Sequence, residues 1–179
     1  PFRAGAFYRC RGGVDAQKKI AVIQVICATQ GIGPGRDEDD KPQPVSDNRG
    51  EIAGLLTDYY QTIPHYSFGG ISTRSPIPTM WWRAPIANVD AFACESFIDE
   101  LAHLSKQDPL EFRKTHLTSV RYRALADKLA VVSNWDVREK RAGWGVAITD
   151  SFGGRVGQVV KVSRANDKKL KIDKVFAVI

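Results

Sequence analysis

The chain has 179 residues, 43% of them hydrophobic and 26% charged, which is enough for one domain, or two small ones, with a buried core. No apolar run approaches the roughly 18 residues that a membrane-spanning helix requires, so no transmembrane helix is predicted. The three cysteines, Cys10, Cys27 and Cys94, lie on apolar-patterned segments without metal-site spacing. We therefore expect buried thiols outside any disulfide or metal site.

The net charge of +6 is unevenly distributed along the chain. Residues 1–112 carry 11 Lys/Arg and 14 Asp/Glu, whereas residues 113–179 carry 15 and 6. A basic half is compatible with binding to nucleic acid or to an acidic partner. The basic residues are scattered, however, and no nucleic-acid motif is present. We expect a solvated face that meets the rest of a larger protein.

Two strands are predicted at the start of the chain. Ala6–Asp15 and Lys19–Thr29 flank the turn Val14–Lys18, and the second strand is apolar on both faces, which is typical of a buried strand. The turn has no glycine, so we expect a longer hairpin loop rather than a two-residue one. Residues 30–48, rich in Gly, Pro and acidic side chains, are predicted to form an exposed loop rather than a phosphate or calcium site.

The middle of the chain contains two short patterns and one clear helix. Asn48–Thr57 is helical in pattern, while Tyr66–Thr73 and Thr79–Trp82 are expected to be extended. The clear helix ends near His103 or Ser105, and Asn88 or Asp90 is its predicted N-cap. Its apolar stripe consists of Cys94, Phe97, Ile98 and Leu101. Its solvated face is expected to carry Glu95, Asp99 and Glu100.

Two further helices are predicted from their caps. Asp108 is a predicted N-cap with Pro109 at the first helical position and Glu111 three residues after the cap. Ser119 is the predicted N-cap of the next helix. The apolar face of that helix consists of Tyr122, Leu125, Leu129 and Val132.

Three strands are predicted at the end of the chain, at Gly143–Thr149, Arg155–Arg164 and Leu170–Val178. The order of strands, then helices, then strands predicts an α+β fold of antiparallel strands with helices packed on one side.

Arg83 is the first candidate for a binding residue. A guanidinium keeps its charge in an apolar setting and donates in a planar fork, which suits phosphate or an oxyanion. Beside Trp81 and Trp82 it would line a flat aromatic pocket. The alternative is packing, with the arginine stem covering a tryptophan ring.

The glycine pair in Ser151–Gly154 is the second candidate. Gly153 and Gly154 would let a ligand approach backbone N–H groups closely, because no Cβ intervenes. A bend or bulge between two strands explains the pair equally well. The histidines lack the spacing of metal ligands, so we expect surface or packed side chains at His65, His103 and His116.

Three segments in order carry a family resemblance: WWRAP, AFACESFIDELAH and DPLEFR. Together they resemble the molybdopterin-binding large subunit of the xanthine dehydrogenase and aldehyde oxidase family, in particular its isoquinoline 1-oxidoreductase β-subunit type. The first hairpin is similar too, with Lys18 where the family usually has a turn glycine. The opening PFRAG and the closing KVFAVI fit a piece of a longer protein. The resemblance implies that residues 1–118 are part of the first molybdenum-cofactor-binding domain, and that 119–179 are a helix plus the start of the second.

The resemblance also implies a function. The full-length protein would be an oxidoreductase that uses a molybdopterin-type molybdenum cofactor to oxidise an N-heterocycle or aldehyde with oxygen derived from water. Its partners would be the remainder of the large subunit, an iron–sulfur small subunit or domain, and the small-molecule substrate. The family's catalytic glutamate lies downstream, so we expect no catalytic residue and no metal ligand here, and no activity of this piece alone. Family members of this branch are often exported, which favours the periplasm and leaves the cytoplasm open. The alternative is a non-catalytic basic module or scaffold that binds a partner subunit or nucleic acid.

The resemblance assigns site residues to the two candidate bends. Those expected to contact the cofactor are Trp82, Arg83, Ala84, Phe152, Gly153 and Gly154. Those expected to border the substrate are Trp81, Pro85 and Val156. Ala84 and Pro85 stand where the purine-oxidising branch has Gly-Phe, so the aromatic clamp of that branch is not expected.

Overall fold

The computed structural model describes residues 2–30, 58–59, 62–73, 77, 79, 82–84, 87–151, 153–165 and 169–179. Its elements are β1 (Ala6–Val14), β2 (Ile20–Gln30), β3 (His65–Thr73), α2 (Ala87–Leu104), α3 (Pro109–His116), α4 (Val120–Ser133), the 3₁₀ turn η2 (Trp135–Val137), β4 (Gly143–Ser151), β5 (Gly154–Arg164) and β6 (Leu170–Val178). The loop expected after β2 and the helix expected at Asn48–Thr57 lie outside the described residues. Of the extended segment expected at Thr79–Trp82, Thr79 forms an isolated parallel bridge with Phe2.

The strands form two three-stranded sheets, ordered β1-β2-β3 and β4-β5-β6. The second sheet is antiparallel throughout, whereas in the first β1 runs antiparallel to β2 and β2 runs parallel to β3. A parallel pair needs a long connection, and β2 ends at Gln30 well before β3 begins at His65 in the sequence. The α+β class is confirmed, with the strands divided between two sheets and one parallel pairing among them.

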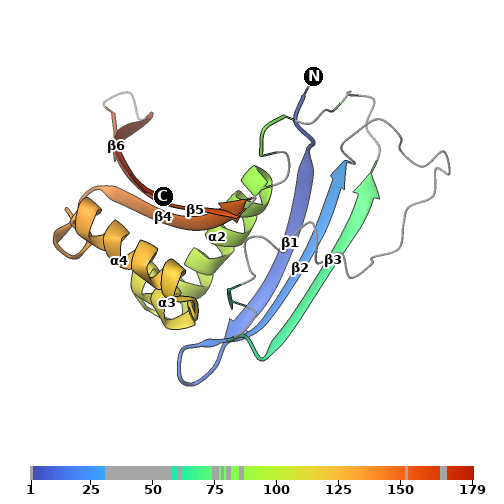
Figure 1. The fold of residues 1–179 in the computed structure, drawn as a ribbon, viewed down its shortest axis with the longest axis horizontal. Coiled ribbons are helices and arrows are strands. Elements are labelled where there is room, and N and C mark those ends of the chain that lie inside the picture. The colour runs from blue at the N-terminus through green and yellow to red at the C-terminus, as the bar shows by residue number, and fades with distance from the viewer. Residues whose placement is uncertain are drawn as a thin grey trace.

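Helix α2 lies between the two sheets (Figure 1). It contacts β1 on one side and β4 on the other, while α4 contacts β5 and β6. The buried side chains form one continuous hydrophobic cluster that includes Ile23 and Val25 of β2, Ile98 and Leu101 of α2, and Ile148 of β4. Full burial of each such side chain stabilises the fold by about 1.5–3 kcal/mol. The α2 stripe therefore joins the two halves of the chain.

The predicted stripe of α2 agrees with the structure, and the expected burial of the cysteines is confirmed for Cys27 and Cys94 but not for Cys10. Cys94, Ile98 and Leu101 are buried and Phe97 is half-buried. Cys27 is buried and Cys10 is half-buried, and no disulfide joins the cysteines, all of which are described.

The β1–β2 connection is the longer hairpin loop that the missing glycine predicted. The backbone N–H of Lys18 donates to the carbonyl oxygen of Asp15 at 2.9 Å, and the Asp15 carboxylate accepts from the Lys19 N–H at 2.9 Å. Lys18 has φ 61°, in the left-handed region that favours glycine. Its carbonyl accepts a hydrogen bond from the Gln107 side chain at 2.8 Å, which ties the turn to the end of α2.

The predicted N-cap of α2 is wrong, whereas Ser119 is confirmed at the N-cap position of α4 but makes no side-chain cap bond; tertiary contacts explain both findings. Helix α2 begins at Ala87, ahead of Asn88 and Asp90. Asp90 lies in the first turn, where its buried carboxylate accepts a hydrogen bond from the Tyr8 hydroxyl of β1. Ser119 occupies the N-cap position of α4 without a side-chain cap bond.

The start of α4 is held from outside the helix, and α3 is capped as predicted. The Asp58 carboxylate accepts the backbone N–H groups of Thr118 at 2.8 Å and of Ser119 at 3.0 Å. In α3 the Asp108 carboxylate accepts from the N–H groups of Leu110 and Glu111, with Pro109 at the first helical position.

Candidate functional site

The Trp-Arg corner lies immediately before α2 and is fastened to the start of the chain by Arg3. The Arg3 guanidinium donates to the carbonyl oxygen of Arg83 at 2.8 Å and lies 5.7 Å from the centre of the Trp82 ring. Trp82 is 51% exposed, and Arg83 and Ala84 are exposed as well. Ala84 has φ 56°, so this corner is a sharp bend held in place by one guanidinium.

The contacts of the corner leave the Arg83 side chain available. Within the described segments no ion pair involves the Arg83 guanidinium, and the cation over the Trp82 ring is Arg3. The packing alternative for Arg83 on Trp82 therefore has no support. Trp81 and Pro85 lie outside the described residues.

The diglycine bend joins β4 to β5. Gly153 has φ 82°, and a Cβ placed on it would meet no atom within 4 Å. A Cβ on Gly154 would lie 3.4 Å from the carbonyl oxygen of Ser151. The turn conformation alone therefore requires a glycine at 153, and the space beside its backbone is open. Phe152 lies outside the described residues.

The two bends belong to different segments. Gly153, Gly154 and Val156 are brought together because they share one hairpin. The structure records no hydrogen bond between this hairpin and Trp82–Ala84 in the part of the chain that it describes. Both adjoin α2, the corner by sequence and the hairpin through β4. A shared pocket stays a prediction.

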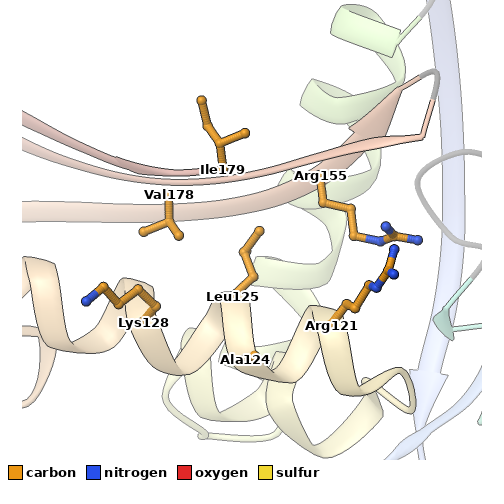
Figure 2. A pocket seen from close by; sticks show the side chains of 7 residues that line it. All are labelled: Arg121, Ala124, Leu125, Lys128, Arg155, Val178 and Ile179. Carbon is orange, nitrogen blue, oxygen red and sulfur yellow. The ribbon is translucent and has the colours of Figure 1, made fainter.

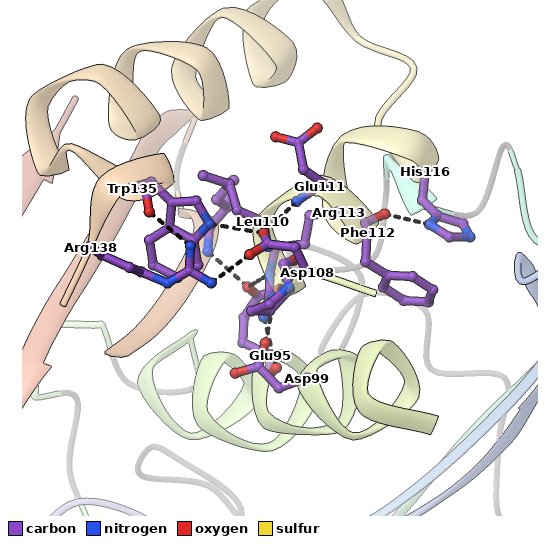
Figure 3. Close-up of polar contacts among 12 residues, drawn as sticks. Glu95, Asp99, Asp108, Leu110, Glu111, Phe112, Arg113, His116, Trp135 and Arg138 are labelled. Carbon is purple, nitrogen blue, oxygen red and sulfur yellow. Dashed lines mark hydrogen bonds and ion pairs between the residues drawn. The ribbon is translucent and has the colours of Figure 1, made fainter. Parts of the chain in front are cut away.

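A buried ion pair is the feature that the sequence analysis missed. Glu95, expected on a solvated face, is only 3% exposed, and Arg113 of α3 is wholly buried. Arg113 donates from Nε to the Glu95 carboxylate at 2.9 Å and from Nη2 to the Glu95 carbonyl at 2.9 Å (Figure 3). The backbone N–H of Ile148 in β4 donates to the same Glu95 oxygen at 2.8 Å. One carboxylate thus joins α2, α3 and β4.

The remaining guanidinium nitrogen of Arg113, Nη1, also has hydrogen-bond acceptors. Nη1 donates to Asp99 at 2.5 Å and to the Pro109 carbonyl at 3.0 Å. Burial raises the pKa of Glu95, and the Arg113 charge opposes that rise. For Arg113, burial alone would lower the pKa, but the charges of Glu95 and Asp99 and the buried Tyr59 together outweigh it and raise the pKa. Glu95 lies three residues before Ile98 on the helix, a spacing that pointed to the buried face.

A second polar cluster surrounds Asp108. Its carboxylate accepts from Trp135 Nε1 at 2.9 Å and from Arg138 Nη2 at 2.6 Å, beyond its role as the α3 cap (Figure 3). The Arg138 guanidinium lies 4.0 Å from the centre of the Trp135 ring. Burial tends to raise the pKa of Asp108, but these hydrogen bonds outweigh it and lower the pKa. The cluster fixes η2 against the start of α3.

His116 is a packed histidine, as expected, while His65 and His103 are exposed. The Nε2 atom of His116 accepts a hydrogen bond from the Ile20 N–H at 2.9 Å. The proton of the neutral ring is therefore on Nδ1, which donates to the Phe112 carbonyl at 2.8 Å. Burial lowers the pKa of His116.

In the segments that the structure describes, no group of three or more His, Cys, Asp and Glu side chains is placed to hold a metal ion. Nor does any helix there have the length and apolarity needed to cross a membrane.

The fold recurs within larger oxidoreductases. The aldehyde oxidoreductase of Desulfovibrio desulfuricans matches 95% of this chain with a TM-score of 0.55 and 16% identity, over 21% of its own length. The aldehyde oxidoreductase of Desulfovibrio gigas matches 95% of this chain with a TM-score of 0.52 and 14% identity, over 21% of its own length. The quinoline 2-oxidoreductase of Pseudomonas putida matches 88% of this chain with a TM-score of 0.52 and 14% identity, over 25% of its own length. The chain therefore has the fold of a segment of these enzymes.

One sequence relative is a subunit of an oxidoreductase. The β subunit of isoquinoline 1-oxidoreductase from Brevundimonas diminuta is 33% identical over 104 residues, an alignment that takes in 50% of this chain and 13% of the relative. No family model matches the chain. The chain is thus partially homologous to that β subunit, and it spans about an eighth of the subunit's length.

Proposed function

We propose that this chain is a segment of the large subunit of a molybdenum hydroxylase. In the full-length protein it would supply two walls of the pocket that holds a molybdopterin-type cofactor and a flat organic substrate. The wall at the corner consists of Trp81, Trp82, Arg83, Ala84 and Pro85, and the wall at the bend of Phe152, Gly153, Gly154 and Val156. The partial homology to the isoquinoline 1-oxidoreductase β subunit supports this proposal.

The geometry of the described residues fits an anionic, phosphate-bearing cofactor. Arg83 presents an exposed guanidinium without an ion pair among the described residues, next in sequence to the half-exposed Trp82. Gly153 leaves open space next to its backbone, where ligand atoms would reach N–H groups without meeting a Cβ. The single observation that carries the proposal is this exposed, Arg3-braced corner with a charge left available.

The roles of this segment are binding and positioning. The cofactor, when bound, would supply the oxygen-transfer chemistry of a hydroxylase. Arg83 would hold a negative charge of the cofactor, and Trp82 would offer a flat face for an aromatic ring. The proposed division of labour assigns residues 1–118 to the first cofactor-binding domain and 119–179 to the start of the second. The proposed substrate is an N-heterocycle or an aldehyde, and an iron–sulfur subunit or domain would accept the electrons.

The test is the substitution Arg83→Gln in the full-length enzyme. Loss of a hydrogen bond to a charged group is worth about 1.5–3 kcal/mol, so we expect activity or cofactor content to fall by about 10- to 100-fold. The melting temperature should stay unchanged because Arg83 is exposed. Arg141→Gln, at an exposed arginine before β4, is the matched control and should be neutral. Lost folding in Arg83→Gln would instead favour a purely structural scaffold.

A further inference from the structure

A cavity of about 430 Å³ lies between α4 and the β4–β6 sheet. Arg121, Leu125 and Lys128 line it from α4, where their spacing of four and three residues places them on one helical face. Arg155 of β5 and Val178 of β6 line it from the sheet (Figure 2). Val156, next to Arg155 in the strand, points to the opposite face. The cavity is therefore on the other side of the sheet from the proposed substrate wall.

The cavity concentrates positive charge. Three of its lining side chains are cationic, Arg121, Lys128 and Arg155, and none of its lining side chains is acidic. The guanidinium groups of Arg121 and Arg155 point toward one another at one end (Figure 2). No ion pair recorded for the described residues involves any of the three cations. Two guanidiniums that face each other repel unless an anion lies between them.

The surroundings of Arg155 strengthen the case for an anion. Its Nε atom is buried and has no hydrogen-bond partner. Asp150, which pairs with Arg155 across the β4–β5 ladder, is the nearby carboxylate; its Oδ2 accepts the Tyr122 hydroxyl at 2.5 Å, while its Oδ1 is buried without a partner and does not accept from Arg155 Nε. The Arg155 guanidinium stacks over the Tyr122 ring at 5.0 Å. A buried donor without an acceptor is costly, and an anion bound here would supply the acceptor.

The floor of the cavity is apolar. Leu125 and Val178 lie between the arginine end and Lys128 (Figure 2). Gly157 of β5 has no Cβ, so Leu125 of α4 packs directly against the sheet at this point. A Cβ on Gly157 would lie 2.5 Å from the Leu125 side chain. An anion that fits both features carries its charge on an apolar body.

We propose that this cavity binds an amphipathic carboxylate. The Arg121 and Arg155 guanidiniums hold the carboxylate group in paired hydrogen bonds, and the hydrocarbon chain lies over Leu125 and Val178. The ligand class is therefore a medium-chain carboxylic acid in its ionised form. This site is separate from the proposed cofactor pocket and does not depend on it.

The test is calorimetric titration of the full-length protein with octanoate. We expect saturable binding that weakens at least tenfold for octanol, which lacks the charge, and for acetate and inorganic phosphate, which lack the apolar chain. Equal binding of phosphate and octanoate would overturn the amphipathic assignment. Absence of octanoate binding would overturn the site.

Three variants locate the binding. Arg121→Met, at an exposed position of α4, should weaken octanoate at least tenfold without a change in folding. Arg155→Met keeps an unbranched apolar stem and should have a similar effect. Lys140→Met is the matched control, since Lys140 is an exposed cation that does not line the cavity. Unchanged affinity in Arg121→Met, or an equal loss in Lys140→Met, would contradict the proposal.

Discussion

At the scale of single residues, Lys18 stores strain in the β1–β2 turn. A non-glycine residue in the left-handed region costs about 1–2 kcal/mol, and the φ of Lys18 is 61°. We expect Lys18→Gly to raise the free energy of unfolding by roughly 0.5–1 kcal/mol, because glycine's extra entropy in the unfolded chain offsets part of the gain. Chemical denaturation measures the change. Lys18→Ala keeps a Cβ and should show no such gain; a gain equal to that of glycine would refute the strain argument.

His116 makes the stability of the chain depend on pH. Its folded pKa is lowered from 6.5, because burial and the Ile20 N–H hold the ring neutral. Between the lowered folded pKa and the unfolded value the unfolded chain binds more protons. The free energy of unfolding should therefore fall as the pH drops below about 6.5 and be fully retained above it.

The measurement is the free energy of unfolding between pH 5 and pH 8 for the parent chain and for His116→Gln. The parent should lose stability on acidification more steeply than the variant, since glutamine does not titrate. His103→Gln, at an exposed histidine of α2, is the control and should follow the parent curve. If the parent and His116→Gln curves have the same slope, His116 is not the group responsible.

At the scale of elements, Arg113 and Glu95 hold α2, α3 and β4 together. Arg113→Met would leave the buried Glu95 carboxylate without its cation, and we expect a loss of about 3–5 kcal/mol in the free energy of unfolding. Lys114→Met, at the next position of the same helix, breaks only partly exposed pairs with Glu111 and Asp127 and should cost at most about 1 kcal/mol. Pairing Arg113→Met with Glu95→Leu should recover part of the loss. Equal costs for the two single variants would contradict the role of the buried pair.

The same scale shows which elements could be predicted. The α3 cap and the strand Leu170–Val178 are both confirmed. They were predictable because their signals are local: the Asp-Pro pair marks the cap, and a polar turn precedes the strand. The wrong N-cap of α2 and the missing side-chain cap bond of Ser119 depend on Tyr8 and Asp58, which lie far away in the sequence. Glu95 was assigned to the solvated face because of its charge, although its spacing from Ile98 indicated burial; the partner that makes its burial possible, Arg113, is 18 residues away on another helix.

Two aspects of the site and fold lay beyond local patterns. The parallel pairing of β2 with β3 depends on the path of a long crossover, which side-chain alternation does not encode. At the corner, the pattern identified Arg83 beside a tryptophan pair, but not that Arg3 braces the bend from a position 80 residues away. Periodicity thus locates segments, while the contacts that hold a site in place come from distant parts of the chain.

At the scale of the whole molecule, this chain spans 13% of its sequence relative and 21–25% of the similar enzymes of known structure. The two proposed walls would contribute a guanidinium, an aromatic face and open backbone, none of which can replace a base or a redox centre. We therefore predict that the purified 179-residue chain will not oxidise aldehydes or quinoline-type rings, while the full-length protein will do so and will contain molybdenum and pterin. Steady-state assays and metal analysis of both proteins test this. Substrate oxidation by the isolated chain would overturn the assignment of this segment to binding alone, and a full-length protein without molybdenum would overturn the proposed class of enzyme.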